Sequence, residues 1–210
     1  MVRPSGAKNF AEYAAESLIP YVSSKFRNTS RVDVVWDRDL NDLLKNTARA
    51  KRGKVVRRRV VAETAIPRNW HDFLLVDENN TELFSFLSHA LMESFEQENE
   101  QLVIIDGELV LCQPPLEDSL SLASCNHEEA FTRIMLHVAH AASQDHDKIL
   151  VRAMDTVVVI LAISTVPVLS PETEIWLAFE LERSTDTWPL IQCYRVLDQI
   201  DLLHCRCSMR

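Results

Sequence analysis

The sequence predicts an α/β fold, and three observations support this prediction. Amphipathic helical patterns and short β-rich runs follow one another along the 210 residues. Residues 125 to 163 combine an acid-rich helix start, an amphipathic helix, a polar turn and a buried strand that is followed by a further acid. A composition of 47% hydrophobic and 25% charged residues is that of a globular chain, and its length suits one domain of ordinary size with room for an appendage.

Several function classes are excluded by composition. The chain contains no run of roughly 18 apolar residues, so we expect no membrane span, and its first residues lack the apolar core of a signal peptide. Five irregularly spaced cysteines predict reduced thiols in an intracellular protein, nuclear or cytoplasmic. With three glycines and no glycine-rich phosphate loop, the sequence predicts no small-molecule cofactor.

The charge is unevenly distributed. Formal net charge is -9, yet residues 45–59 carry eight basic residues and no acid. A local basic cluster on an acidic protein can still bind a phosphate backbone, because the electrostatic potential near the cluster, and not the net charge, determines the attraction. Solvated surface and a nuclear import signal are the alternatives. The candidate DNA or RNA contacts are Lys51, Arg52, Lys54, Arg57, Arg58 and Arg59.

The first elements are a helix over residues 9–26 and a strand over 31–37. Pro20 predicts that the helix ends or kinks near Ile19, because proline has no backbone N–H. The strand ends on Asp37. An acid at the carboxyl end of a strand suits a ligand site in an open α/β sheet, but Asp37 could equally cap the following helix.

The middle of the chain predicts helices and a hairpin. A short helix is expected over residues 70–76, followed by a long amphipathic helix from an N-cap at Asn80 to about residue 100. Asp106-Gly107 between apolar runs predicts a β-hairpin over 101–112, with Asp106 as a turn residue rather than a ligand. Residues 114–124 are expected to form a loop.

The elements from residue 126 onward are a capped helix, a strand over 148–153 and an apolar run over 157–163. Asn126 and Glu129 form a capping-box-like start, and Asp155 follows the strand. The apolar run suits either a strand or a buried helix. A further strand is expected over 174–179, and a tail follows whose cysteines are read as ordinary thiols rather than zinc ligands.

Three short motifs resemble a known family. They are His127-Glu128-Glu129-Ala130-x-Thr132-Arg133, then Ile149-Leu150-Val151-Arg152, then Asp155-Thr156-x-Val158-Val159. They resemble the PIN-like domain of flap endonuclease/XPG-type nucleases, and more closely a group of uncharacterised animal PIN-like proteins with the motifs HEEADTR and VDTDVVVLA. The similarity is specific over residues 125–163 and moderate elsewhere up to about residue 179.

The resemblance implies a three-layer, Rossmann-like PIN fold with a mostly parallel central sheet, incomplete at its C-terminal end. Residues 1–30 would be a helical extension, 31–179 the PIN-like α/β domain and 180–210 a divergent tail. The family's metal-dependent nuclease mechanism would assign Asp37, Glu129 and Asp155 as catalytic acids. These three, with the neighbouring Glu128, would bind Mg²⁺ or Mn²⁺, which favour carboxylate oxygens and water.

Two positions depart from the family motifs. Phe131 stands where the helix motif has aspartate, and Val157 replaces the second aspartate of Asp-Thr-Asp. Each change removes a charged oxygen ligand. The sequence therefore predicts a catalytically impaired or inactive relative of these nucleases that retains nucleic-acid binding. The alternatives are an active Mg²⁺/Mn²⁺-dependent phosphodiesterase on DNA or RNA, and a protein-interaction module or non-functional fragment.

Overall fold

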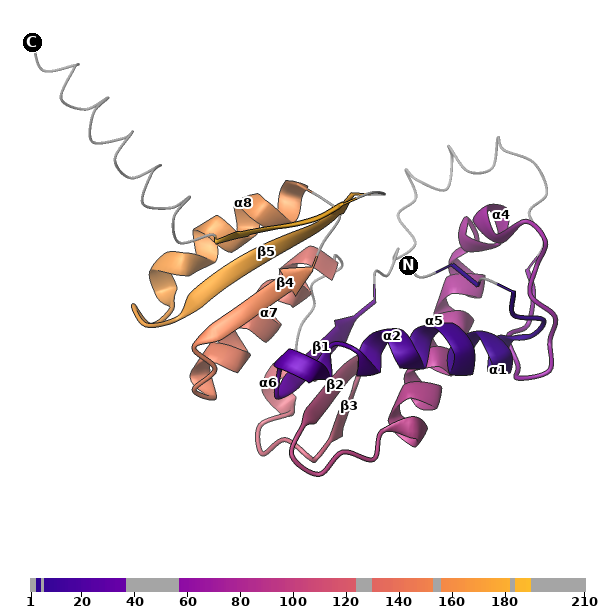
Figure 1. Ribbon diagram of the computed structural model, residues 1–210, viewed down its shortest axis with the longest axis horizontal. Coiled ribbons are helices and arrows are strands. Elements are labelled where there is room, and N and C mark those ends of the chain that lie inside the picture. Colours follow the sequence, from indigo (N-terminus) through magenta and orange to yellow (C-terminus); the bar gives the residue numbers. More distant parts are fainter. Residues whose placement is uncertain are drawn as a thin grey trace, which may run out of the picture. The chain divides into compact units, whose positions relative to one another are not determined.

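The computed structural model describes residues 3–4, 6–36, 57–123, 130–152, 156–181 and 184–189. The chain divides into two compact units, unit 1 (residues 1–130) and unit 2 (residues 131–210). Each unit contains helices and one three-stranded mixed sheet (Figure 1). The predicted α/β class is confirmed, whereas the single mostly parallel sheet and the domain limits at residues 30 and 179 stay predictions.

The sheet of unit 1 has the strand order β1-β2-β3. Strands β1 (Arg31–Val35) and β2 (Gln101–Asp106) run parallel, with Val35 opposite Ile105. Strand β3 (Leu109–Gln113) returns antiparallel to β2. The carboxyl ends of β1 and β2 therefore lie at the same edge of the sheet, and β1 ends two residues before Asp37 in the sequence.

The β2–β3 hairpin confirms the turn prediction but places Asp106 differently. Asp106 is the last residue of β2 and pairs with Leu109, so Gly107 and Glu108 form the two-residue loop. Gly107 has φ of 74°, and Glu108 is not among the described residues with positive φ. Glycine at the first loop position alone is the signature of a type II′ turn, whose twist suits a hairpin.

The N-terminal helical run continues through Pro20. It comprises α1 (Phe10–Tyr13), the π-helical η1 (Ala14–Leu18) and α2 (Ile19–Ser23), and the 3₁₀ turn η2 (Phe26–Asn28) follows. Of the two predicted outcomes, an end or a kink near Ile19, the end is wrong; at that residue the run changes from the π-helical η1 to α2. A π-helical segment directly before the proline lets the chain continue where the ordinary α-helical hydrogen bond is missing.

The other helices of unit 1 are α4 (Trp70–Leu74), α5 (Asp77–Ser94) and α6 (Leu120–Ala123). The predicted N-cap at Asn80 is wrong, because α5 begins at Asp77 and Val76 is its N-cap. The Asn80 side chain instead donates to the carbonyl of Leu74 at the end of α4. The expected loop over residues 114–124 contains α6.

The core of unit 1 joins the N-terminal helices to α5 and the sheet. Its fully buried members include Phe10, Tyr13, Leu83, Leu87 and Ile104. The α1–α2 run and α5 lie beside one another (Figure 1). Burial of these apolar side chains on helix α5 and strand β2 holds the sheet edge in place.

Unit 2 consists of two main helices and a second sheet. Its elements are α7 (Ala130–Ser143), β4 (Lys148–Arg152), α8 (Thr156–Thr165), the 3₁₀ turn η4 (Val166–Val168), β5 (Glu174–Leu181) and β6 (Ser184–Pro189). Strands β4 and β5 are parallel, and β6 pairs antiparallel with β5. The ambiguous apolar run over residues 157–163 is helical.

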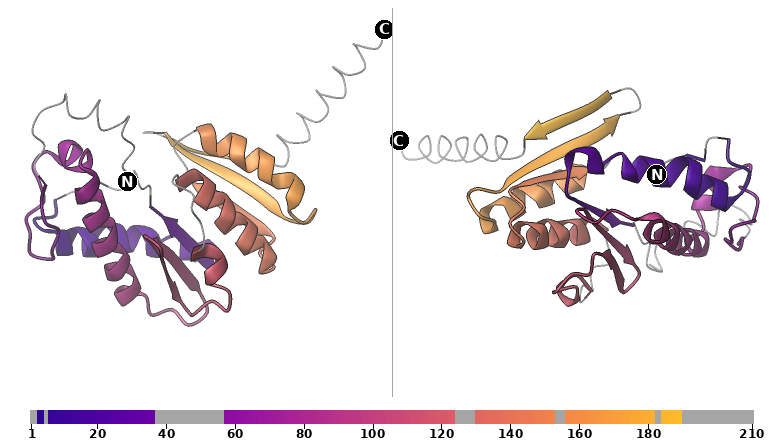
Figure 2. Two further views of the ribbon diagram at one scale, coloured as in Figure 1. Left: turned by 180° about the vertical axis from the view of Figure 1, so that it is seen from behind. Right: turned by 60° about the horizontal axis from the view of Figure 1, so that its bottom comes forward.

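One face of this sheet carries the core of unit 2. Val138 of α7 and Val158 of α8 contribute to the same buried cluster as Val151 and Ile175 of the strands. Both helices therefore cover the same face (Figure 2). Among the described residues, no helix is long and apolar enough to cross a membrane.

Candidate functional site

The four predicted metal ligands lie outside the described residues. They are Asp37, Glu128, Glu129 and Asp155. The structure describes the elements that adjoin them in sequence: β1 ends two residues before Asp37, α7 begins directly after Glu129, and α8 begins directly after Asp155. Their roles and mutual distances therefore stay predictions.

The residue that precedes Asp37 is anchored to helix α5. The indole Nε1 of Trp36 donates to Ser88 Oγ at 2.8 Å, and Ser88 in turn donates to the carbonyl of Phe84. The indole also stacks on the Phe84 ring, with the ring planes 4° apart and the centroids separated by 4.9 Å. These contacts fix the carboxyl end of β1 up to the residue before the predicted ligand.

Asp33, the acid within β1, already has a partner. Arg31 donates from Nε and Nη2 to the two carboxylate oxygens of Asp33, at 2.7 and 2.8 Å. The Arg31 side chain is buried, and a two-point Arg–carboxylate contact of this kind is strong. Asp33 is therefore a structural acid.

Asp106 is a further candidate residue, which the sequence interpretation treated as a turn residue rather than a ligand. It ends β2 beside the end of β1, and its side chain is only 9% exposed. Ser85 Oγ of α5 donates to Asp106 Oδ2 at 2.8 Å, and His89 Nδ1 lies 3.8 Å from the same oxygen. The Asp-Gly turn signal masked this placement, since only the parallel pairing of β1 with β2 brings the two strand ends together.

His89 is oriented by its own helix. Its Nδ1 donates to the carbonyl of Ser85 at 2.8 Å, while the ring is largely exposed. Ser85, His89 and Asp106 thus form a polar group at the carboxyl end of β2. In this group the serine hydroxyl donates to the carboxylate and the imidazole donates to a backbone carbonyl, so neither contact activates the serine as a nucleophile.

The two departures from the family motifs differ in what the structure shows. Val157 is the second residue of α8, and 42% of it is exposed. An apolar side chain thus stands in an accessible place where the motif has an aspartate. Phe131 is the second residue of α7, and its side chain lies outside the description.

The basic segment is described only at its end. Lys51, Arg52 and Lys54 lie outside the described residues, whereas Arg57, Arg58 and Arg59 are described and exposed. This end is attached to α5, because the Arg58 N–H donates to Asn79 Oδ1 at 2.8 Å and the Val60 N–H donates to Glu82 Oε2 at 2.9 Å.

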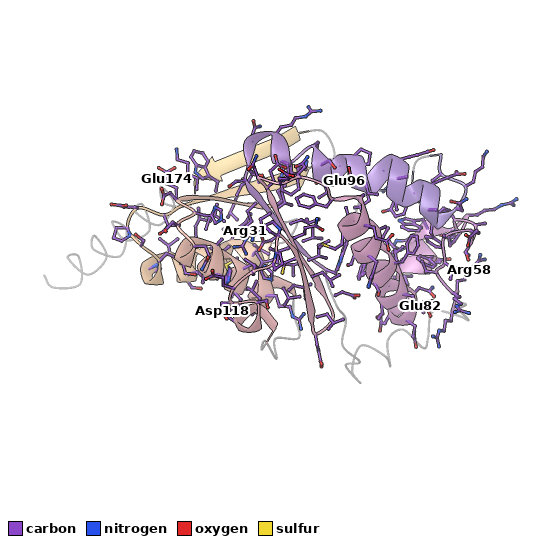
Figure 3. All side chains as sticks on the ribbon, turned by 90° about the horizontal axis from the view of Figure 1, so that it is seen from below. Arg31, Arg58, Glu82, Glu96, Asp118 and Glu174 are labelled. Atoms are coloured by element: carbon purple, nitrogen blue, oxygen red, sulfur yellow. The ribbon has the colours of Figure 1, made fainter. Side chains whose placement is uncertain are left out.

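Glu82 also contacts an arginine side chain. Its Oε1 accepts from Arg57 Nη2 at 3.0 Å. Glu82 and Arg58 lie at the same end of unit 1 (Figure 3). The hydrogen bond from the Val60 N–H, and then the contact with Arg57, lower the pKa of the Glu82 carboxyl. Both interactions favour the ionised form.

Within the parts of the chain that the structure describes, no group of three or more His, Cys, Asp or Glu side chains is placed to hold a metal ion. None of the protein-family models, curated proteins or solved structures compared with the chain matches it. The PIN-like resemblance therefore rests on the motifs between residues 125 and 163 and stays a prediction.

Proposed function

We propose that the chain is a PIN-like nuclease-family protein whose catalytic centre is impaired or inactive and which retains nucleic-acid binding through residues 45–59. The observation that carries the binding proposal is the exposure of Arg57, Arg58 and Arg59 on a backbone that α5 anchors. Because the backbone is already anchored, binding has to order only the arginine side chains when their guanidinium groups contact phosphate oxygens.

The impaired centre is inferred from Phe131 and Val157. The chain has two carboxylates fewer than the family motifs. The acids that remain to ligate a metal are Asp37, Glu129 and Asp155, together with Glu128, the sequence neighbour of Glu129. Mg²⁺ or Mn²⁺ bound there would supply an activated water and charge stabilisation. Each 1.4 kcal/mol of lost transition-state stabilisation slows the reaction about tenfold, so we expect the loss of two ligands to reduce cleavage strongly.

Binding is tested with a fluorescently labelled single-stranded oligonucleotide and the purified full chain, by anisotropy. We expect binding that weakens steeply as salt increases and is unchanged by EDTA, because it depends on phosphate contacts and not on a metal. Absence of binding at low salt by a cooperatively folded sample would contradict the proposal.

An active metal-dependent phosphodiesterase is the second candidate, and Asp106 is the observation in its favour. Its carboxylate at the end of β2 adds an acid to the sheet edge at which β1, the strand that precedes Asp37 in the sequence, also ends. Incubation with flap and single-stranded substrates plus Mg²⁺ or Mn²⁺ tests this candidate. Cleavage that an Asp155→Ala variant loses would favour it, and equal behaviour of both proteins would exclude it.

A further inference from the structure

Glu82 uses its two oxygens for different partners. Oε2 accepts the Val60 backbone N–H at 2.9 Å, whereas Oε1 accepts Arg57 Nη2 at 3.0 Å. Both partners belong to the same short segment, and Asn79 holds one of the two residues between them by accepting the Arg58 N–H. One side chain thus combines a backbone anchor with an ion pair.

The backbone contact is the one that the fold requires. Val60 is buried in the core of unit 1, and Asn79 is fully buried, with its Nδ2 donating to the carbonyl of Phe73. A buried N–H that loses its acceptor is destabilising. The anchor needs an oxygen acceptor at residue 82, which a neutral amide also supplies.

The contact with Arg57 is of a different kind. The Arg57 side chain is 69% exposed and that of Glu82 is 29% exposed, so water and salt screen the pair. Exposed ion pairs contribute little to stability, which means that a stronger anion can replace the carboxylate. A phosphodiester offers two oxygens to the same guanidinium and lies in a chain of further phosphates.

We propose that Glu82 is an internal competitor for nucleic-acid phosphate: its carboxylate occupies Arg57 in the free protein and releases it to a backbone phosphate when a single-stranded nucleic acid binds. This inference rests on the proposed nucleic-acid binding. An isolated phosphate gains one contact and must displace Glu82, whereas a polynucleotide also gains contacts with the exposed Arg58 and Arg59. Glu82 therefore weakens, by the same factor, the binding of every ligand that contacts Arg57. Only a polyanion, which makes additional contacts, then keeps a useful affinity.

The test is Glu82→Gln in the full chain, with anisotropy of a labelled single-stranded oligonucleotide at low salt. Glutamine retains an oxygen for the Val60 N–H and removes the charge from Arg57. We expect affinity to rise about two- to fivefold, the range that an exposed ion pair supports. The matched control is Glu78→Gln, which removes the same charge from an exposed position one turn earlier on α5.

The Arg57→Ala background makes the test specific. Without Arg57, Glu82→Gln should change affinity no more than Glu78→Gln does. Equal effects of the two glutamine variants in the wild-type background, with the wild-type chain still binding, would overturn the inference and leave the proposed function intact. A folded wild-type chain that binds no oligonucleotide at low salt would overturn both.

Hydrogen exchange of the Val60 amide separates the two roles. We expect the protection of Val60 in Glu82→Gln to stay closer to that of the wild-type chain than to that of Glu82→Ala, which has no acceptor. Exchange in Glu82→Gln as fast as in Glu82→Ala would show that the anchor needs the charge, and would overturn the division of roles between the two oxygens.

Discussion

Two polar side chains of α5 hold a segment that is distant in the sequence. Asn79 and Glu82 accept backbone N–H groups from residues that lie 21 and 22 positions earlier. Nothing in the helical pattern of α5 distinguishes them from ordinary surface residues. Their partners became visible only when the segment was placed against the helix.

Glu82 makes the stability of unit 1 depend on residue type and on pH. We expect Glu82→Ala to lower the free energy of unfolding by about 1–3 kcal/mol, because the Val60 N–H loses its acceptor. Glu82→Gln should lose less than Glu82→Ala at pH 7, because it keeps an oxygen for the Val60 N–H and lacks only the contribution of the ionised carboxylate. Urea unfolding of the full chain at pH 7 measures both, and equal losses in the two variants would contradict the role of the oxygen.

The pH dependence follows from the lowered pKa of Glu82. A carboxyl whose pKa is lower in the folded than in the unfolded state stabilises above the unfolded pKa and loses that contribution as pH falls through the folded pKa. Between pH 7 and pH 3 the wild-type chain should therefore lose more stability than Glu82→Gln. Parallel pH profiles for the two proteins would contradict this expectation.

Asp106 gives a second prediction at the level of single residues. Asp106→Ala leaves the Ser85 hydroxyl without the acceptor that it has at 2.8 Å, so we expect a loss of about 1–3 kcal/mol in the free energy of unfolding. Glu108→Ala, in the same hairpin but exposed, should change stability by less than about 0.5 kcal/mol. Chemical denaturation of both variants measures the difference, and similar losses would argue that Asp106 has only a turn role.

Among the elements, α8 shows how tertiary packing decides whether an apolar run forms a strand or a helix. Residues 157–163 suit a strand or a buried helix by composition, and the structure makes them helical with Val158 and Ala162 fully buried. The opposite side carries Val157 and Ile160, which are 42% and 67% exposed. Apolar residues all round a helix thus coexist with one exposed side, which residue type alone does not reveal.

Val157→Asp tests whether the missing acid can be restored at low energetic cost. The position is accessible and lies in the first turn of α8, where a negative charge interacts favourably with the helix dipole by about 0.3–1 kcal/mol. We expect stability within about 0.5 kcal/mol of the wild type. If the predicted metal site exists, Mn²⁺ should raise the Tm of this variant more than that of the wild-type chain.

Ile160→Asp is the matched control, because it places the same charge at a more exposed position in the middle of α8. It should be less stable than Val157→Asp, and Mn²⁺ should not affect its Tm beyond the wild-type response. Equal responses of the two variants to Mn²⁺ would contradict a metal site that includes position 157.

At the scale of the whole molecule, the charge distribution decides what the chain can bind. The net charge of -9 repels a polyanion at long range, while residues 45–59 attract it locally. Salt shortens the reach of both effects, with a Debye length of about 8 Å at physiological ionic strength. Contacts at the basic segment therefore dominate any binding that survives in moderate salt.

Replacing Arg57, Arg58 and Arg59 together by alanine should weaken oligonucleotide binding uniformly across sequences. For single strands, each lost phosphate contact reduces the slope of log affinity against log salt by about 0.7, so the triple variant should lose about 2. A salt titration by anisotropy measures the slope. The control replaces Arg3, Arg27 and Arg68, which are also exposed, and an equal loss there would indicate a general charge effect.

Much of the local structure could be predicted from the sequence. The strands over residues 31–35, 101–106, 109–113, 148–152 and 174–181 follow β-rich runs, and the helices at 70–74 and 130–143 follow apolar periodicity. The predictions were wrong where the same residue type is compatible with two local structures. Pro20 continues a helix through a π-helical segment, and Asn80 caps the preceding helix α4 instead of starting its own.

The sequence alone determined the α/β class, most of its elements, the basic segment and the motifs that suggest a PIN-like nuclease with two lost acids. These features depend on residues that are close in the sequence, because hydrophobic periodicity, charge clusters and short motifs can be recognised along a single chain. Only the tertiary structure decided that α8 is a helix, that Asp106 ends a strand parallel to β1, and that Glu82 holds both Val60 and Arg57. Each of these depends on contacts between residues far apart in the sequence, where the burial of one segment sets the partners of another.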